Sequence, residues 1–132
     1  MHDPPRILIV DDNEANRDIL TTRLATQGYD LSEAADGEEA VAAAKAVVYD
    51  AILMDVHMPK MDGLAATRAI RALEGPGGRA PIIAMSADVM PQSIERCRAA
   101  GMVDHVAKPV QIKALHEVLA RKMAEQRRRN AA

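Results

Sequence analysis

The sequence predicts an α/β fold in which one parallel β-sheet is covered by helices on both faces. Five short apolar segments alternate with five segments of helical periodicity. The central segments are apolar at every position, which is typical of strands that are buried on both faces of a parallel sheet. Right-handed crossovers between such strands give an open, doubly wound sheet. The 132 residues suffice for one domain with its own core.

The first half of the chain is expected to supply three strands and two helices. The strands are predicted at 6–10, 29–34 and 51–54. Between the first two, apolar residues recur with helical spacing from Asn13 onward, and Gly28 closes that segment. Asp36 and Glu39 have the spacing of a capping box, and they open an alanine-rich helix.

The second half is expected to supply two strands and three helices. The strands are predicted at 82–85 and 105–107, and the helices at about 63–73, 92–100 and 112–123. The glycine-rich segment 75–78 is interpreted as a loop, because it lacks the Gly-Lys-Ser/Thr end of a phosphate-binding P-loop. We expect residues 1–5 to form an N-terminal extension, 6–124 the domain and 125–132 a basic tail exposed to solvent.

Composition excludes several classes of function. The formal net charge is −2, with 17 basic and 19 acidic residues, so no global field attracts nucleic acid or a membrane surface. Cys97 is the only cysteine, which excludes an internal disulfide and suits a reducing cytosol. The start, MHDPPR, contains no apolar signal segment, and no apolar run could span a bilayer. We therefore expect a cytoplasmic protein without a zinc site, because the histidines lack metal-binding spacing.

Polar residues follow four of the predicted strands. These residues are Asp11 and Asp12, then Asp55, Ser86 and Lys108. Because the carboxyl ends of parallel strands lie at one edge of the sheet, these side chains should converge there. Two like charges about 4 Å apart repel by roughly 4 kcal/mol at an effective dielectric near 20, so either a pKa rises or a cation binds. Oxygen ligands of this kind suit Mg²⁺, and an exposed carboxylate beside it could accept a phosphoryl group.

This constellation resembles the receiver domain of two-component response regulators, the CheY-like superfamily. The matching motifs are Asp11-Asp12, Asp55 with MPKMDG at 58–63, Ser86-Ala87 and Lys108-Pro109. The resemblance extends from Arg6 to about Met123, and it is to single-domain regulators and to the receivers of hybrid histidine kinases. It implies a flavodoxin-like sheet of five strands in the order 2-1-3-4-5 with five helices.

The resemblance implies roles for the acidic residues. Asp55 would be the phosphoacceptor, taking its phosphoryl group from a histidine kinase or a histidine phosphotransfer protein. Asp12 and Asp55 would bind Mg²⁺ directly together with the backbone carbonyl of His57, with Mn²⁺ as a possible substitute. Asp11 would act mainly through water. His57 and Asp88 occupy positions that tune the lifetime of the phosphoryl group in similar domains.

The resemblance also implies a switch. Ser86 would move toward the phosphoryl oxygens, and Lys108 would pair with them. The peptide bond before Pro109 is cis in similar domains. The usual aromatic switch residue is replaced here by His105, which could pack inward behind Ser86 and could bring pH sensitivity near neutrality. We expect His105→Tyr to change partner binding more than phosphorylation.

The implied function is a phosphorylation-controlled interaction module of a phosphorelay. It would not be an enzyme beyond self-phosphorylation from small donors and autodephosphorylation. Phosphorylation would switch the face formed by the fourth helix, fifth strand and fifth helix, roughly 92–128, toward a protein effector. No DNA-binding domain or membrane contact is expected, and the protein would be a monomer or weak dimer. A free-standing regulator and a receiver of a hybrid kinase both remain open.

The alternative is an enzyme, a Mg²⁺-dependent phosphohydrolase with an aspartyl-phosphate intermediate. Enzymes similar to haloacid dehalogenases place a second acid two residues after the nucleophile, where this chain has His57. Turnover of small phosphoesters would favour that alternative. A flavin-binding fold is excluded, because no Ser/Thr-rich phosphate loop follows the first strand and Phe and Trp are absent. The basic residues Arg127, Arg128 and Arg129 are interpreted as solvated.

Overall fold

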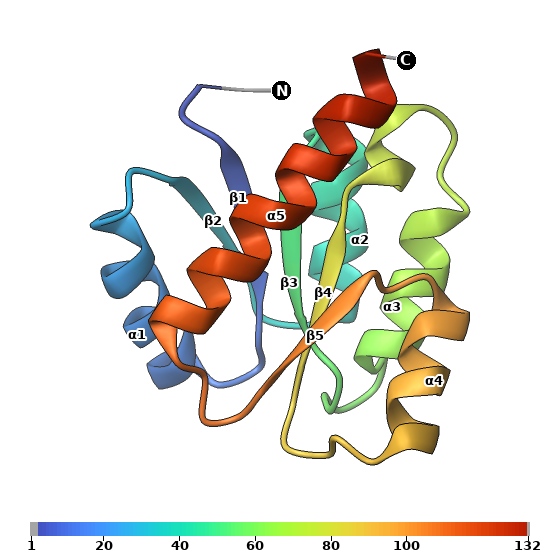
Figure 1. Cartoon of the computed structure of the whole chain (residues 1–132). Coiled ribbons are helices and arrows are strands. Elements are labelled where there is room, and N and C mark those ends of the chain that lie inside the picture. Colours follow the sequence, from blue (N-terminus) through green and yellow to red (C-terminus); the bar gives the residue numbers. More distant parts are fainter. Residues whose placement is uncertain (1–2, 132) are drawn as a thin grey trace.

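The structure, a computed structural model, describes residues 3–131. It contains a parallel sheet of five strands in the order β2-β1-β3-β4-β5 with helices on both faces (Figure 1). The strands are β1 (Arg6–Val10), β2 (Asp30–Ala34), β3 (Ala51–Asp55), β4 (Ile82–Ser86) and β5 (Asp104–Ala107). The helices are α1 (Glu14–Ala25), α2 (Gly37–Ala46), α3 (Gly63–Arg71), α4 (Pro91–Ala100), α5 (Ile112–Ala131) and the 3₁₀ helix η1 (Pro76–Arg79). The predicted fold class and strand order are confirmed.

The sheet separates two apolar cores. Successive side chains of a strand point to opposite faces. In β1, Leu8 therefore faces the core with α2, α3 and α4, whereas Ile7 faces the core with α1 and α5. Ile52 and Leu53 divide in the same way in β3. Burial on both faces explains why the central strands are apolar at every position.

Polar side chains cap the N-termini of three helices. The side-chain oxygens of Asn13, Asp36 and Asp62 accept backbone N–H groups at the starts of α1, α2 and α3 at distances of 3.1, 2.8 and 2.8 Å. Such caps satisfy donors that the helix leaves unpaired. The predicted capping box at α2 is only half formed, because Glu39 Oε1 accepts the N–H of Ala35 and not that of Asp36.

The last helix is longer than predicted. It continues to Ala131, so the described part of the expected tail is helical, while Met123 is its last buried residue. Residues 1, 2 and 132, which belong to the expected extension and tail, lie outside the described residues. Between residues 3 and 131, no helix has the length and hydropathy that a bilayer crossing requires.

Candidate functional site

Three carboxylates meet at the carboxyl edge of the sheet. Asp55 is the last residue of β3, and Asp11 and Asp12 follow directly after β1. One oxygen of each carboxylate lies within 4.8 Å of the other two. Asp11 and Asp55 are buried, whereas Asp12 is exposed. The site is therefore an oxygen-only cluster that opens to solvent on the side of Asp12.

Lys108 brings a positive charge to this cluster from the end of β5. Its Nζ donates to Asp55 Oδ1 at 3.0 Å and lies 3.9 Å from Asp11 Oδ2. The backbone N–H of His57 also donates to Asp55 Oδ1, at 3.2 Å. Both donors thus fall on one oxygen of Asp55, and within residues 3–131 no hydrogen bond reaches Oδ2.

Burial sets the protonation behaviour of Asp55. Desolvation raises the pKa of its carboxyl above the usual aspartate value, and the negative charge of Asp11 adds to the rise. The hydrogen bond and charge of Lys108 and the amide of His57 act in the opposite direction without cancelling it. The single positive charge of Lys108 therefore does not neutralise the negative charge of the three carboxylates. Hard oxygen donors with excess negative charge fit a divalent cation such as Mg²⁺.

A glycine allows the loop after Asp55 to fold back over the end of β3. A Cβ atom at Gly63 would collide with the carbonyl oxygen of Asp55 and lie 2.9 Å from Val56 Cα. The N–H of Gly63 donates to Val56 O at 2.9 Å, and Asp62 caps the helix that starts there. The Asp62-Gly63 pair, which belongs to the MPKMDG motif at 58–63, is therefore a positioning element for the site.

Arg17 of α1 also shapes the site, and sequence reasoning missed it. Its guanidinium donates to the carbonyl oxygen of Asp11 at 2.6 Å and pairs with Glu33 at 3.1 Å. The side chain of Asp11 accepts the N–H of Asn13 at 2.9 Å. These contacts fix the loop between β1 and α1. The sequence offers no sign of them, since Arg17 looks like any charged residue on the solvent side of a helix.

A chain of hydrogen bonds leads from the site to α4. Ser86, buried at the end of β4, accepts the N–H of Asp88 on its Oγ at 3.0 Å. The carboxylate of Asp88 accepts the N–H of Met90 at 3.1 Å and the hydroxyl of Ser93 at 2.6 Å. The Ser93 hydroxyl, followed by the Met90 amide, lowers the pKa of Asp88. Arg96 in turn donates to Ser93 Oγ at 3.1 Å.

His105 belongs to β5, the outermost strand of the sheet, and its ring is partly exposed to solvent. Its side chain is 40% exposed, and Nδ1 lies 3.8 Å from Asp104 Oδ1. Inward packing behind Ser86 is therefore not what the structure shows. The peptide bond between Lys108 and Pro109 is cis.

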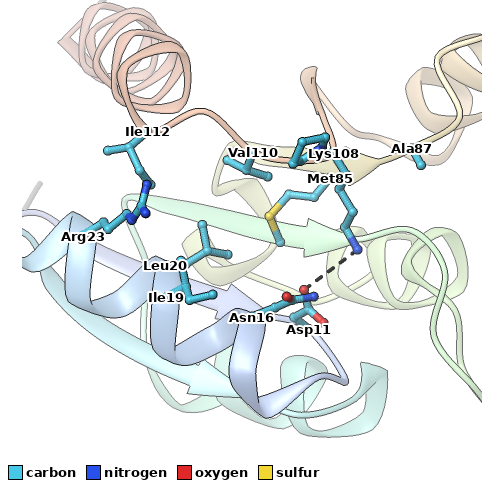
Figure 2. Close-up of a pocket in the computed structure, with 11 residues that line it drawn as sticks. Asp11, Asn16, Ile19, Leu20, Arg23, Met85, Ala87, Lys108, Val110 and Ile112 are labelled. Atoms are coloured by element: carbon cyan, nitrogen blue, oxygen red, sulfur yellow. Dashed lines mark ion pairs between the residues drawn. The ribbon is translucent and has the colours of Figure 1, made fainter.

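A groove adjoins the carboxylate cluster between α1 and the loop after β5 (Figure 2). Its volume is about 630 Å³. One end is formed by Asp11 and Lys108, which also belong to the site. The other end is mainly apolar, and its Ile19 is 52% exposed. We call it the α1 groove; its further lining residues include Asn16, Leu20, Arg23, Met85, Val110 and Ile112.

Comparison with known proteins gives a consistent set of relatives. Residues 7–120 match the family model of the response regulator receiver domain. Hybrid signal transduction histidine kinase I of Dictyostelium discoideum is 39% identical over 122 residues, which cover 88% of this chain and 7% of that protein. Histidine kinase 5 of Arabidopsis thaliana is 36% identical, with 87% of this chain and 15% of that protein covered. The chain thus spans less than a sixth of the length of these two relatives.

Solved structures agree with this result. The receiver domain of the sensor histidine kinase PA1611 from Pseudomonas aeruginosa, which holds a magnesium ion in its active-site cleft, is 42% identical with a TM-score of 0.84. The alignment covers 91% of this chain and 98% of that one. The receiver domain of Ssk1 from Saccharomyces cerevisiae, crystallised with the histidine phosphotransfer protein Ypd1, is a structural neighbour with a TM-score of 0.86. Its identity is 27%, and 92% of this chain and 90% of that one are covered.

Proposed function

The chain belongs to the response regulator receiver domain family of two-component signalling, and from that premise we propose that it accepts a phosphoryl group on Asp55. The observation that carries the proposal is the environment of this carboxylate. It is buried, it has two more carboxylates within 4.8 Å, and Lys108 lies 3.0 Å away. A carboxylate with a raised pKa beside a cation-binding cluster is suited to nucleophilic attack on phosphorus.

Asp11, Asp12 and Asp55 would hold Mg²⁺, together with the backbone carbonyl of His57. The magnesium ion in the PA1611 receiver domain supports this assignment. When bound, the ion supplies positive charge that offsets the repulsion between the carboxylates and an incoming phosphoryl group. Mn²⁺ accepts similar oxygen ligands and would serve as a substitute.

In the proposed transfer the protein supplies positioned side chains, and the ion supplies the charge described above. One carboxylate oxygen of Asp55 forms a bond to phosphorus while the nitrogen–phosphorus bond of a donor phosphohistidine breaks. The imidazole leaves with the bonding electrons and takes up a proton from water. Lys108 Nζ and the Ser86 hydroxyl donate to the phosphoryl oxygens, and the second contact requires Ser86 to turn toward the site. The product is an acyl phosphate on Asp55.

The phosphodonor would dock over the α1 groove. Asp11 and Lys108 belong to both the groove and the site, so a partner on the groove holds its histidine beside Asp55. The exposed Ile19 and the neighbouring Val110 offer apolar contact area. The co-crystal of Ypd1 with the Ssk1 receiver domain supports a histidine phosphotransfer protein as a partner of this class. The resulting charge on Asp55 would bias the face of α4, β5 and α5 toward an effector.

Incubation with acetyl phosphate and Mg²⁺, followed by intact mass spectrometry, tests this proposal. We expect one adduct of about 80 Da per chain, and none with EDTA or in Asp55→Asn. The matched control is Asp18→Asn, which removes an exposed aspartate of α1 and should leave the adduct intact. An equal adduct in Asp55→Asn would refute the assignment. Continuous release of phosphate from small phosphoesters would instead support a phosphohydrolase.

A further inference from the structure

The loop between β3 and α3 has a conformation that needs support from the rest of the fold. It comprises residues 56–62 and carries the backbone carbonyl of His57, one of the proposed ligands of the ion. Lys60, in the same loop, has a φ of 64°, in the left-handed region that residues other than glycine seldom adopt. A backbone in such a conformation persists only where the surrounding structure holds it in place.

The first turn of α2 supplies such support through Gly37. This residue is buried, and a Cβ atom on it would lie 2.7 Å from Met61 O and 2.8 Å from Met61 Cγ. Its φ is not in the left-handed region, so glycine is required here for space and not for conformation. Met61 also packs against the apolar core between α2 and α3, which lie side by side on one face of the sheet (Figure 1). The loop therefore has little room to yield.

The end of β2 holds the loop that carries Asp11 and Asp12. The carbonyl oxygen of Ala34 accepts the N–H of Asp11 at 3.2 Å. Nε of Arg17 donates to Glu33 Oε1 at 3.1 Å, and Nη1 of the same guanidinium donates to Asp11 O at 2.6 Å. The backbone of Asp11 is therefore fixed through its N–H and through its carbonyl oxygen, and both connections lead to the last two residues of β2.

One short stretch of sequence, residues 33–37, thus supports both loops of the site. Its first two residues act on the loop after β1, and its last residue lies against the loop after β3. None of the five belongs to the carboxylate cluster. Within the described part of the chain, the carboxylate of Asp36 is hydrogen bonded only to the N–H of Glu39, so Asp36→Asn should leave both connections in place.

We propose that residues 33–37, together with Arg17, position the two loops that hold the ion. Mg²⁺ requires nearly octahedral geometry with distances of about 2.0–2.1 Å, so a displacement of either loop weakens its binding. Replacement of groups that orient metal ligands typically lowers metal affinity by about 10- to 100-fold. Gly37 and Arg17 would therefore act on metal affinity without touching the metal. The inference rests on the proposed function only in taking these loops as the ones that hold the ion.

Gly37→Ala tests the contact with Met61. The Kd of Mn²⁺ is measured from the EPR signal of the free ion, and that of Mg²⁺ by competition. The added methyl group should displace the loop and raise the Kd of Mn²⁺ at least about tenfold.

Gly77→Ala is the matched control for Gly37→Ala. Its Cβ atom would lie 2.6 Å from the carbonyl oxygen of Ala44, so the same substitution creates a similar collision at the other end of α2. The control should bind Mn²⁺ within about twofold of the wild type, because its collision is remote from both ligand loops. Urea unfolding in EDTA should show comparable losses of stability in the two variants, which separates positioning from a general weakening of the fold.

Arg17→Gln tests the contact with Asp11, and the direction of its effect is diagnostic. The guanidinium brings positive charge close to the acidic cluster, so by electrostatics alone its removal should tighten the binding of a cation. If Arg17 positions the loop, the Kd of Mn²⁺ should instead rise at least about threefold, since the lost charge offsets part of the effect. This variant decides the question if Gly37→Ala does not fold.

Three results would overturn the inference. These are an unchanged Kd of Mn²⁺ in Gly37→Ala, an equal rise in Gly37→Ala and Gly77→Ala, and tighter binding in Arg17→Gln. The acetyl phosphate adduct of the wild type separates this inference from the proposed function. A wild-type chain that binds Mn²⁺ without gaining the adduct would refute phosphorylation of Asp55 and leave the positioning of the ligand loops intact.

Discussion

At the scale of single residues, ionised Asp55 opposes folding as long as no cation is bound. Desolvation raises its pKa in the folded chain, so the folded state binds this proton more readily than the unfolded state. The penalty is fully present above the raised folded pKa. It disappears as the pH falls through that value toward the usual aspartate pKa, because both states are then protonated.

Asp55→Asn should therefore stabilise the metal-free fold at neutral pH and raise its urea midpoint. The difference in stability between Asp55→Asn and the wild type should shrink as the pH is lowered through the folded pKa of Asp55. Urea unfolding at a series of pH values measures this difference. Asp18→Asn, an exposed control on α1, should show no such gain. A neutral-pH loss of stability in Asp55→Asn would contradict the electrostatic account.

The residues of the site that carry chemistry could be predicted from the sequence, because each is a polar residue at the carboxyl end of a predicted strand. Asp11, Asp12, Asp55 and Lys108 lie together as that pattern predicts. The supporting contact of Arg17 could not be predicted in the same way, since its partner is a backbone carbonyl oxygen, which no sequence pattern identifies.

At the scale of elements, Arg71 joins the end of α3 to two other segments. Its guanidinium donates four hydrogen bonds, one to Gly78 O, one to Ala80 O and two to Gly101 O. Burial lowers the pKa of Arg71 from its usual value. The group thus fixes the segment before β4 and the C-terminal end of α4.

Arg71→Leu should destabilise the protein by about 2–4 kcal/mol, because three carbonyl groups lose their donor. Arg71→Lys should recover only part of this loss, since an ammonium group cannot reproduce the planar fork of donors. Chemical denaturation measures both values. The control Arg68→Leu, at an exposed position of the same helix, should change stability by no more than about 0.5 kcal/mol. Similar losses of stability in Arg71→Leu and Arg68→Leu would show that the hydrogen bonds of Arg71 do not stabilise the fold.

Asp88 connects the site to the start of α4. Asp88→Ala removes the acceptors of the Met90 N–H and the Ser93 hydroxyl and should therefore loosen the first turn of α4. Hydrogen exchange should become faster in residues 90–94 while exchange in α5 stays unchanged. Ser93→Ala removes only one of the two contacts and should have the smaller effect. Unaltered exchange at the start of α4 would show that this chain of hydrogen bonds does not hold the helix.

The starts of α1, α2 and α3 could be predicted more reliably than the end of the last helix. Asn13, Asp36 and Asp62 are short polar residues whose capping geometry is local. The extension of α5 to Ala131 carries no such signal, because beyond Met123 none of its residues is buried. Helical propensity and the Lys122–Glu125 pair at 3.2 Å support the helix there, and a charged segment of this kind is equally typical of a solvated tail.

At the scale of the whole molecule, we propose that the domain needs little of the chain after residue 124. Met123 is the last buried residue of α5, so removal of residues 125–132 should cost less than about 1 kcal/mol. The truncated chain should still gain the acetyl phosphate adduct. Thermal unfolding together with intact mass measures these effects. A chain that no longer folds would place the boundary further along α5.

Mg²⁺ should stabilise the whole fold, since only the folded chain gathers the carboxylates of Asp11, Asp12 and Asp55. At ten times its dissociation constant the ion adds about 1.4 kcal/mol, a rise in Tm of about 3–6 °C. Asp12→Asn should reduce this rise, and Asp36→Asn, which alters a helix cap away from the site, should preserve it. A similar rise in both variants would indicate binding elsewhere.

The doubly wound parallel sheet follows from the sequence, because burial on both faces and alternation of strands with helices predict it. The strand order 2-1-3-4-5 is implied by the resemblance to receiver domains, since the alternation alone also allows other orders. The α1 groove does not follow from the sequence. Its walls join α1 to the loop after β5, and these segments are distant in sequence. Only packing of the complete chain determines which apolar side chains, such as Ile19 and Val103, stay exposed.

Chemical localisation of the phosphoryl group tests the central claim most directly. The chain is treated with acetyl phosphate and Mg²⁺, reduced with borohydride, which converts an aspartyl phosphate to homoserine, and digested for peptide sequencing by mass spectrometry. The account predicts homoserine at position 55 and its absence when Mg²⁺ is withheld. Homoserine at position 11 or 12, or none at any position, would contradict it.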